Sequence, residues 1–344
     1  MKKTVLVSGG AGFIGSHVTV ELIEAGYDVV VADNFSNCDR TCYEGVKKIT
    51  GRTDLPLEVV DFCDAEATRK IFAKYPIDAV IHFAAFKAVG ESVEKPLMYY
   101  KNNLLSFLNV LEAAQVKGCN VLFSTSATVY GEPDAVPVTE DTPRKPAASP
   151  YGNTKTMCED ILHDAVKASG GKLKGILLRY FNPIGAHPSA FIGELPNGVP
   201  MNLIPFVTQT AMGIRQQLKI FGHDYSTPDK TCIRDYIYVV DLAKAHVKAM
   251  ERVLDKPETD AVEVFNIGTG KGLSTLEVVE GFEKATGVKV NWTYAPRREG
   301  DIEQVWGNVD KANKVLGWKA DTPTEEVLKS AWKWQVKLRE DGIQ

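Results

Sequence analysis

Gly9-Gly-Ala-Gly12-Phe-Ile-Gly15 is the stretch of sequence that decides the fold. It follows the apolar run 5–7 and precedes a helical pattern, so its glycines lie at a turn from a strand into a helix. Without a Cβ, Gly9 and Gly12 can adopt turn conformations and let a pyrophosphate approach the backbone, while Gly15 permits close packing of the helix. The unpaired amides of the first helical turn then face the anion. The sequence therefore predicts a dinucleotide site here.

Apolar runs alternate with helical patterns along the first half of the chain. The runs, each rich in Val, Ile or Leu, are 5–7, 29–32, 57–60, 79–82, 121–123 and 176–178. The clearest helical patterns between them cover 14–23 and 104–116. Alternating strands and helices imply a parallel sheet with helices on both faces. We predict an α/β fold, a Rossmann-type doubly wound sheet with a smaller, mixed α/β C-terminal domain.

A segment rich in Pro and Gly, 182–200, breaks this alternation. We predict a cofactor domain over 1–181 and a substrate domain over 182–344. A helix predicted over 239–254 leaves open a discontinuous boundary, in which 236–268 returns to the first domain. Capping boxes predict two further helix starts, one at Ser274 with Glu277 and one at Thr322 with Pro323 and Glu325.

The composition is that of an ordinary globular protein. The 344 residues are 44% hydrophobic and 24% charged, with a formal net charge of -4. That balance gives no general attraction to nucleic acid, and no apolar stretch predicts a membrane span. The six cysteines are scattered, without a metal-ligand spacing, so we predict no metal and a reducing compartment, the cytoplasm.

Asp33 ends the second apolar run, about 20 residues beyond the glycine loop. An acidic side chain there accepts hydrogen bonds from the adenosine ribose, and its charge repels a 2′-phosphate. We therefore predict NAD rather than NADP. Asp61-Phe62 follows the third run and either flanks the adenine or forms an ordinary surface turn.

Tyr151 and Lys155 are four residues apart on a predicted helix, so their side chains share a face. A neighbouring ammonium, together with a positive nicotinamide ring, favours the phenolate and is expected to lower the pKa of Tyr151 toward neutrality. Ser126 follows the fifth strand, where its hydroxyl reaches both Tyr151 and a reacting oxygen. This set predicts removal of a hydroxyl proton as hydride leaves the same carbon.

At this point the chain resembles the UDP-glucose 4-epimerases (UDP-galactose 4-epimerases) of the extended short-chain dehydrogenase/reductase family. The resemblance covers nearly the whole length. Two of the stretches that carry it, 9–17 and 149–155, mark the wider superfamily. Those specific to the epimerases are 33–37, 82–92, 126–131, 179–188, 234–237 and 295–301.

The resemblance implies a role for each matching position. It implies that NAD is held by Gly9, Gly12, Phe13, Ile14, Gly15, Asp33, Asn34, Asn37, Asp61, Phe62, Phe83, Ala84, Lys87, Asn102, Ser126, Tyr151, Lys155 and Tyr180. The catalytic residues it implies are Ser126, Tyr151 and Lys155. The substrate residues it implies are Lys87, Ser126, Tyr151, Asn182, Asn202, Leu203, Phe221, Arg234, Arg298, Asp301 and Val305.

The implied reaction interconverts UDP-galactose and UDP-glucose by inversion at sugar C4 through a bound 4-keto sugar. At Val305 the family varies between a bulky aromatic and a small side chain near the sugar's C2 substituent. The valine leads to the hypothesis that UDP-N-acetylglucosamine and UDP-N-acetylgalactosamine are also interconverted. The resemblance further implies a homodimer through helices near 99–115 and 151–168, although their apolar faces could equally cover their own sheet.

Rival interpretations stay open. Related 4,6-dehydratases carry an Asp-Glu pair where this chain has Ala127-Thr128, which disfavours a dehydratase. The alternatives are a UDP-glucuronate epimerase or decarboxylase and, from another class, a non-catalytic NAD-binding regulator. Arg234 and Arg298 could instead pair locally with Asp235 and Glu299 on a solvated surface. His17 and His82 are expected to be structural.

Overall fold

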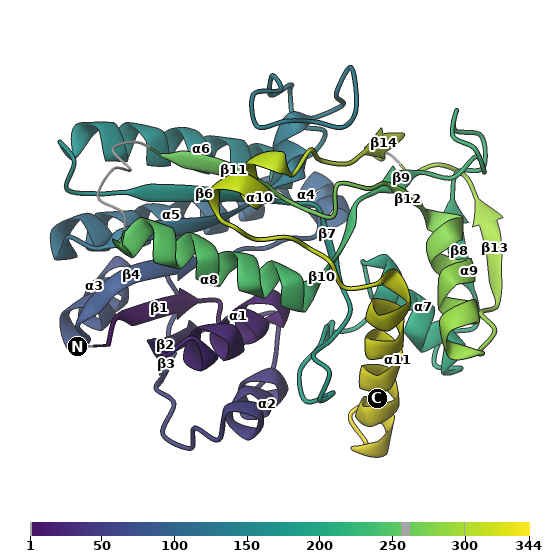
Figure 1. Cartoon of the computed structure of the whole chain (residues 1–344), viewed down its shortest axis with the longest axis horizontal. Coiled ribbons are helices and arrows are strands. Elements are labelled where there is room, and N and C mark those ends of the chain that lie inside the picture. The colour runs from purple at the N-terminus through teal and green to yellow at the C-terminus, as the bar shows by residue number, and fades with distance from the viewer. Residues whose placement is uncertain (1, 256–261, 299) are drawn as a thin grey trace.

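The computed structural model describes residues 2–255, 262–298 and 300–344. At its centre lies a seven-stranded sheet in the order β11-β6-β5-β4-β1-β2-β3, and every pair of neighbours is parallel (Figure 1). The strands are β1 (Thr4–Ser8), β2 (Asp28–Asp33), β3 (Leu57–Val59), β4 (Ile77–His82), β5 (Asn120–Ser126), β6 (Gly175–Tyr180) and β11 (Glu263–Ile267). The predicted doubly wound fold is confirmed.

Helices cover both faces of the sheet. One face packs against α1 (Phe13–Glu24), α2 (Thr41–Thr50), α8 (Val239–Asp255) and α10 (Asp310–Val315). The other face packs against α3 (Ala65–Lys74), α5 (Pro96–Lys117) and α6 (Pro150–Ala168). Alternate residues of one strand enter the two cores: Val5 and Val7 belong to the first and Leu6 to the second. Burial on both faces is the reason the strands are almost continuously apolar.

From α8 (Val239–Asp255) onward, the described part of 236–268 lies against this sheet, whereas residues 236–238 pair with 182–184 outside it. β11 extends the sheet beside β6, and α8 contributes Leu242, Ala243 and Met250 to the same core as α1. The predicted helix over 239–254 is therefore confirmed as α8, with one residue added at its C-terminus. The remaining helix of the first half, α4 (Val89–Glu94), precedes α5.

A smaller lobe lies beyond the carboxyl ends of the strands, on the right in Figure 1. Its helices α7 (Leu203–Ala211), α9 (Thr275–Thr286) and α11 (Thr324–Glu340) share a separate apolar core. Its strands form three short sheets: β8 (Leu218–Phe221) with β13 (Trp292–Ala295), β7 (Asn182–Ile184) with β10 (Tyr236–Tyr238), and β9 (Ile233–Arg234) between β12 (Leu273–Ser274) and β14 (Gln304–Val305).

Of the two predicted capping boxes, one is confirmed and one is wrong. Ser274 caps α9, because its Oγ accepts from the Glu277 amide at 3.0 Å and the Glu277 carboxylate accepts from the Ser274 amide at 2.7 Å. Thr322 does not cap α11, which begins at Thr324 without a side-chain cap. Its hydroxyl instead donates to Asp241 at 3.0 Å, so a contact with α8 replaces the local cap.

The strand order places the site. β1 lies between β2 and β4, so the connections from its carboxyl end and from that of β4 leave in opposite directions. Ligands of such sheets bind in the crevice at that switch point. The glycine loop follows β1, and Asp33, His82, Ser126 and Tyr180 end the next strands along the same edge.

Candidate active site

The three glycines of the loop have different reasons to be glycine. Gly9 has φ of 76°, and a Cβ there would lie 2.8 Å from the Ala84 nitrogen. A Cβ on Gly15 would lie 2.2 Å from the Gly9 carbonyl oxygen, so α1 packs on the loop itself rather than on the strand. A Cβ on Gly12 would meet only the Gly9 oxygen, at 3.4 Å. The space in front of Gly12 is therefore open, as an approaching phosphate requires.

The N-terminus of α1 and the end of β2 fit a dinucleotide. Gly12 is the N-cap of α1 and supplies no capping side chain, so the first-turn amides remain available to an anion. The carboxylate of Asp33 accepts from the Ala11 amide at 3.1 Å and the Phe35 amide at 3.0 Å. Each carboxylate oxygen retains acceptor capacity for a ribose hydroxyl. These residues fit NAD.

The other positions implied for NAD fall into two groups. Phe83 and Ala84 belong to the loop after β4, where both amides donate to the Ser8 carbonyl, at 2.8 and 3.1 Å. Tyr180, at the end of β6, is buried and hydrogen-bonded to His246. Exposed or half-buried side chains form the second group: Asn34, Asn37, Asp61, Asn102, Phe13 and Ile14.

Phe62 differs from the rest of that set. Its side chain is 3% exposed and belongs to the core under α3 and α5, and its carbonyl accepts from Asn109 at 2.8 Å. A role in holding the adenine is therefore limited to its backbone. Asp61, next to it, accepts from the Cys63 amide at 2.8 Å and remains exposed.

Ser126 and Tyr151 meet at the centre of the edge. Ser126 is the last residue of β5, and its Oγ accepts from the Thr128 amide at 3.2 Å. Tyr151 is the second residue of α6, whose N-cap Ser149 accepts from the Gly152 amide at 3.1 Å. The Tyr151 hydroxyl lies near enough to Ser126 for the Ser126 side chain to oppose the rise of the Tyr151 pKa. A strand end and a helix start thus bring together two hydroxyls.

Lys155 lies one turn further along α6, where it is 4% exposed. Its Nζ donates to the Ser124 carbonyl at 2.7 Å and lies 5.9 Å from the centroid of the Tyr151 ring. Burial lowers the pKa of Lys155 to about 8, against opposing effects of Cys158 and Glu159. The ammonium is therefore still the main form at pH 7, though only by about one pH unit.

The expected lowering of the Tyr151 pKa depends on a bound nicotinamide ring, and the protein alone shifts this pKa in the opposite direction. Burial raises the pKa of Tyr151 to about 12, and the Ser126 side chain only partly offsets this. Desolvation destabilises the phenolate by more free energy than the surrounding residues contribute to stabilising it. The protein by itself thus holds Tyr151 protonated.

Arg234 has partners other than the one considered from sequence. Its guanidinium donates to the carbonyl oxygens of Ile302 at 2.7 Å and Ile233 at 2.8 Å. Asp235 instead turns inward, where it is fully buried and accepts from the amide and hydroxyl of Thr269 at 2.8 and 2.7 Å. A local Arg234–Asp235 surface pair is therefore excluded.

Arg298 pairs with another residue implied for the substrate. Its Nε and NH2 donate to the two oxygens of Asp301, at 2.9 and 3.1 Å, and the guanidinium lies 5.0 Å from the Phe221 ring centroid. The Arg298 side chain is 51% exposed, so this pair is weakly held. Glu299, the alternative partner, lies outside the described residues.

Lys87 and Asn202 are joined by a residue that the sequence did not suggest. The Glu194 carboxylate accepts from Lys87 at 3.1 Å and from Asn202 at 2.5 Å. Lys87 follows β4, and Asn202 precedes Leu203, the first residue of α7, so Glu194 links the two lobes. Asn182 of β7 is exposed, and its backbone amide donates to the Asp235 carbonyl at 2.9 Å. No local motif marks Glu194, because Lys87 is distant in sequence and Asn202, eight residues away, lies outside the spacing of a helical turn or a capping box.

Val305 is buried rather than open to solvent. It is 5% exposed and shares a small apolar cluster with Ala127, Tyr130 and Phe181. In β14 it pairs in register with Arg234 of β9. Val305 thus packs against Ala127, the residue that directly follows Ser126.

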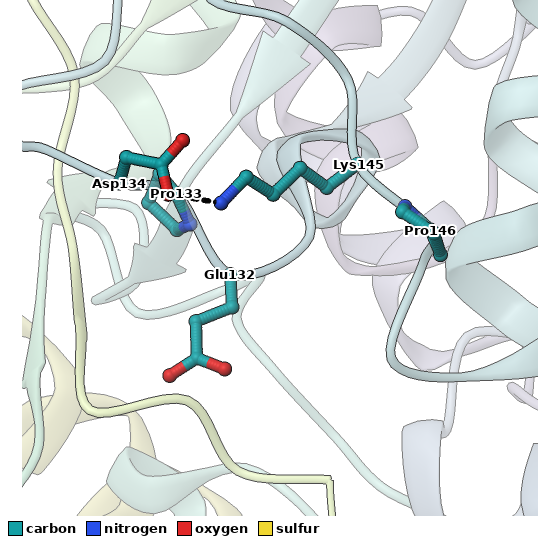
Figure 2. A pocket seen from close by; sticks show the side chains of 5 residues that line it. All are labelled: Glu132, Pro133, Asp134, Lys145 and Pro146. Atoms are coloured by element: carbon teal, nitrogen blue, oxygen red, sulfur yellow. Dashed lines mark hydrogen bonds and ion pairs between the residues drawn. The ribbon is translucent and has the colours of Figure 1, made fainter.

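A surface hollow lies on the loop that joins β5 to α6. Figure 2 shows its lining, in which Lys145 pairs with Asp134 while Glu132, Pro133 and Pro146 complete the rim. None of these side chains belongs to the predicted site. Among the described residues there is also no cluster of three His, Cys, Asp or Glu side chains suited to a metal. In that same part of the chain no helix is long and apolar enough to cross a bilayer.

The predicted structural histidines are buried. His17 is 1% exposed and donates from Nδ1 to the Phe13 carbonyl at 2.7 Å. His82 is 1% exposed and its Nδ1 hydrogen-bonds with Ser8 Oγ at 2.7 Å. Burial lowers the pKa of each to about 3, so both are neutral at physiological pH.

Comparison with known proteins identifies relatives of this chain. Residues 6–331 match the family model described as GDP-mannose 4,6 dehydratase. The chain is 50% identical to UDP-glucose 4-epimerase 2 of Arabidopsis thaliana over 337 residues, covering 97% of this chain and 95% of that protein.

Solved structures of named epimerases are also similar to this chain. UDP-glucose 4-epimerase from Bifidobacterium longum, crystallised with NAD+ and UDP, superposes with a TM-score of 0.93 at 45% identity, covering 97% of this chain and 98% of the other. The UDP-Glc/GlcNAc 4-epimerase of Campylobacter jejuni superposes with a TM-score of 0.82 at 34% identity, covering 97% and 99%.

Proposed function

The chain belongs to the UDP-glucose 4-epimerase family, and we propose that its own Ser126, Tyr151 and Lys155 carry out the NAD-dependent interconversion of UDP-galactose and UDP-glucose. The observation that carries the assignment of residues is the meeting of Ser126 and Tyr151 at one sheet edge, with Lys155 buried one turn behind them. The glycine loop and Asp33 share that edge.

NAD, when bound, supplies the acceptor and donor of hydride together with a positively charged ring. Its pyrophosphate would be held by the amides after Gly12 and its adenosine ribose by Asp33. Lys155 provides a second positive charge, on a side chain that the Ser124 carbonyl holds at 2.7 Å. Both charges favour the Tyr151 phenolate, which burial alone disfavours.

Tyr151 moves the proton and Ser126 orients the sugar. The Tyr151 Oη takes the proton of the sugar C4 hydroxyl, and the Ser126 Oγ donates to the same sugar oxygen. The C4 carbon becomes a ketone as its hydrogen leaves as hydride, which bound NAD would accept and would later give back to the other face of C4. When the sugar presents its other face, the Tyr151 Oη returns the proton and the opposite C4 configuration results. Arg234 and Arg298 hold the diphosphate, since guanidinium forks match its oxygens.

Incubation of the purified protein with UDP-galactose, without added NAD, tests this proposal. We expect UDP-glucose among the separated products, because a cofactor that is regenerated in each cycle need not be released. Absence of conversion both without and with added NAD would contradict the function. Conversion only with added NAD would support the proposed reaction and would contradict the claim that NAD stays bound during purification.

N-acetylated sugars form the second part of the proposal. Val305 is small and packs against Ala127, next to Ser126, and a solved structure with 34% identity is a UDP-Glc/GlcNAc 4-epimerase. UDP-N-acetylglucosamine and UDP-N-acetylgalactosamine are therefore substrates as well. Val305→Tyr is expected to abolish their turnover and to leave UDP-galactose within about threefold. Since a larger side chain can overpack a cluster, the melting temperature is measured alongside. Wild-type protein inactive on both acetylated sugars contradicts this part.

A homodimer through α5 and α6 is the third part. These helices expose Leu97, Leu105, Leu108 and Met157, by 81, 36, 39 and 41%. Apolar side chains gathered on neighbouring helices favour association. Sedimentation should give the dimer mass for wild type and the monomer mass for Leu108→Glu. A wild-type monomer at micromolar concentration contradicts the dimer.

The remaining assignments concern organisation and location. Residues 1–181 with 236–268 hold NAD, and the rest of 182–344 holds the UDP-sugar. All six cysteines are free thiols, which supports a reducing compartment such as the cytoplasm. Limited proteolysis with and without NAD tests the division, because NAD should protect the first set of residues only.

A further inference from the structure

A charged network is buried directly behind the catalytic residues. Glu159 of α6 is 0% exposed and Arg179 of β6 is 5% exposed. They form a bidentate pair, with Arg179 Nε 3.0 Å from Glu159 Oε1 and NH2 2.7 Å from Oε2. Thr125 of β5 donates its hydroxyl to Glu159 Oε1 at 2.7 Å. The network thus joins one helix to two adjacent strands.

Each anchor is adjacent to a catalytic residue. Thr125 directly precedes Ser126. Glu159 follows Lys155 by four residues and Tyr151 by eight, so all three share the face of α6 that packs on the sheet. The same carboxylate therefore fixes the rotation of α6 relative to the strand that carries Ser126.

The second side of Arg179 extends the network past Ser126. Its NH1 donates to the Tyr130 hydroxyl at 3.0 Å and to the Glu140 carbonyl at 3.2 Å. Tyr130 ends the short 3-10 turn after Ser126 and donates to Asn266 of β11 at 2.6 Å. On one side of Ser126, Tyr130 is therefore bonded to the Arg179 guanidinium directly, and on the other side Thr125 is linked to it through Glu159.

Stability alone does not explain such a pair, because well-packed apolar residues often replace a buried ion pair without loss of stability. Starting from the proposed function, we propose that Glu159, Arg179 and Thr125 position the catalytic set: they fix the rotation of α6 so that Tyr151 and Lys155 face Ser126. They are positioning residues, since none of them contacts the reacting atoms.

Glu159 has an electrostatic effect on Lys155 in addition to its geometry. Burial lowers the pKa of Lys155 to about 8, and Cys158 and Glu159 oppose that shift. From β4, His82 faces the same ammonium and is neutral. Without the Glu159 charge, Lys155 loses its proton at lower pH, so the alkaline fall of kcat should move to lower pH.

Three variants test the proposal in the NAD-loaded full-length protein with UDP-galactose. Glu159→Gln keeps the shape and removes the charge; kcat is expected to fall between about ten- and a hundredfold with KM nearly unchanged, because misplacement by about 1 Å costs that much. Its alkaline limb should move down by roughly one pH unit. Thr125→Val should lower kcat several-fold without moving that limb.

Glu263→Gln is the matched control. Glu263 of β11 forms a bidentate pair with Arg252 of α8, at 2.5 and 2.8 Å, far along the sheet from Ser126. It should lower the melting temperature at most and leave kcat and its pH profile unchanged.

The double variant Glu159→Leu with Arg179→Met separates positioning from folding. If it restores wild-type melting temperature while kcat stays low, the pair positions the catalytic set. If kcat returns with the melting temperature, or if Glu159→Gln lowers only the melting temperature, the pair is structural and the proposal is wrong. If Glu159→Gln does not fold, Thr125→Val and the double variant still distinguish a positioning role from a structural one. Inactive wild-type protein would instead overturn the proposed function.

Discussion

The two sides of the active site are held in different ways. On the catalytic side, Lys155 is 4% exposed and donates to a backbone carbonyl. On the substrate side, Arg298 is 51% exposed and donates to the carboxylate of Asp301. A buried contact to the backbone fixes position and pKa, whereas an exposed ion pair is worth about 0–1 kcal/mol and exchanges easily. The proposed catalytic set thus has a rigid frame, and the side chains proposed to bind the nucleotide are ones that can release their present partners.

Glu194 forms another polar contact with an exposed side chain, at the place where the two lobes meet. Its carboxylate holds Lys87 from the first lobe and Asn202 from the second. The Lys87 side chain is 56% exposed, so this contact, like the Arg298–Asp301 pair, involves a solvent-exposed cation. Substitutions on the catalytic side should therefore change kcat, and those on the substrate side should change KM.

The largest effect is expected from Tyr151→Phe. Removal of the hydroxyl that carries the proton should lower kcat by about 10³-fold, within the range for general acid-base catalysis. Because the hydroxyl is not part of the core, circular dichroism and NAD content should stay as in wild type. Tyr294→Phe, at a 41% exposed tyrosine of β13, is the control. Near-normal turnover by Tyr151→Phe would remove this residue from the proton transfer.

Lys155→Met is expected to be next, with kcat lower by about 10²-fold. In wild type, kcat should fall as pH rises through about 8, where the buried ammonium loses its proton. Stability should move the other way. Between pH 8 and the ordinary value of 10.5 the unfolded chain binds more protons at this lysine, so its contribution to the free energy of unfolding rises with pH.

Kinetics and denaturant titration from pH 7 to 10 on wild type and Lys155→Met check both statements. The difference in unfolding free energy between the two proteins should change in the stated direction. A kcat that is flat from pH 7 to 10 would contradict the role of the Lys155 charge.

Arg298→Met sharpens the contrast from the substrate side. Loss of a guanidinium from the diphosphate should cost about 2 kcal/mol of binding, or about thirtyfold in KM, with kcat changed little. Its neighbour provides a matched control, since Arg297 pairs with Asp224 and stacks 3.9 Å from the Tyr225 ring centroid. Arg297→Met should leave KM within about twofold. Equal effects of the two variants would mean that general positive charge, rather than Arg298, binds the nucleotide.

Two glycine variants are expected to change cofactor binding and stability rather than kcat. Gly12→Ala places a methyl group in open space, 3.4 Å from the Gly9 oxygen, so the fold should keep its melting temperature while bound NAD weakens roughly tenfold. Gly15→Ala forces a contact of 2.2 Å and should destabilise the protein by about 2 kcal/mol. Thermal melting with measurement of copurified NAD distinguishes them. The reverse pattern would exchange the roles we give the two glycines.

Short-range patterns identified the doubly wound sheet, the glycine loop at the end of β1 and the spacing of Tyr151 and Lys155. These features depend on residues that are neighbours along the chain, because strand burial, helix periodicity and turn conformation act over a few residues. The capping box at Ser274 belongs to the same class and is present.

Only the tertiary structure decided the partners. Thr322 binds Asp241 instead of capping α11, Asp235 turns from Arg234 to Thr269, and Glu159 finds Arg179 and Thr125. Each pair joins segments that are distant in sequence, so no local pattern marks it. The pKa of Tyr151 also depends on the structure, because its sign follows from how much burial opposes the anion. The sequence by itself thus determined which groups exist and on which elements they lie, while folding determined which charges meet and how deeply they are buried.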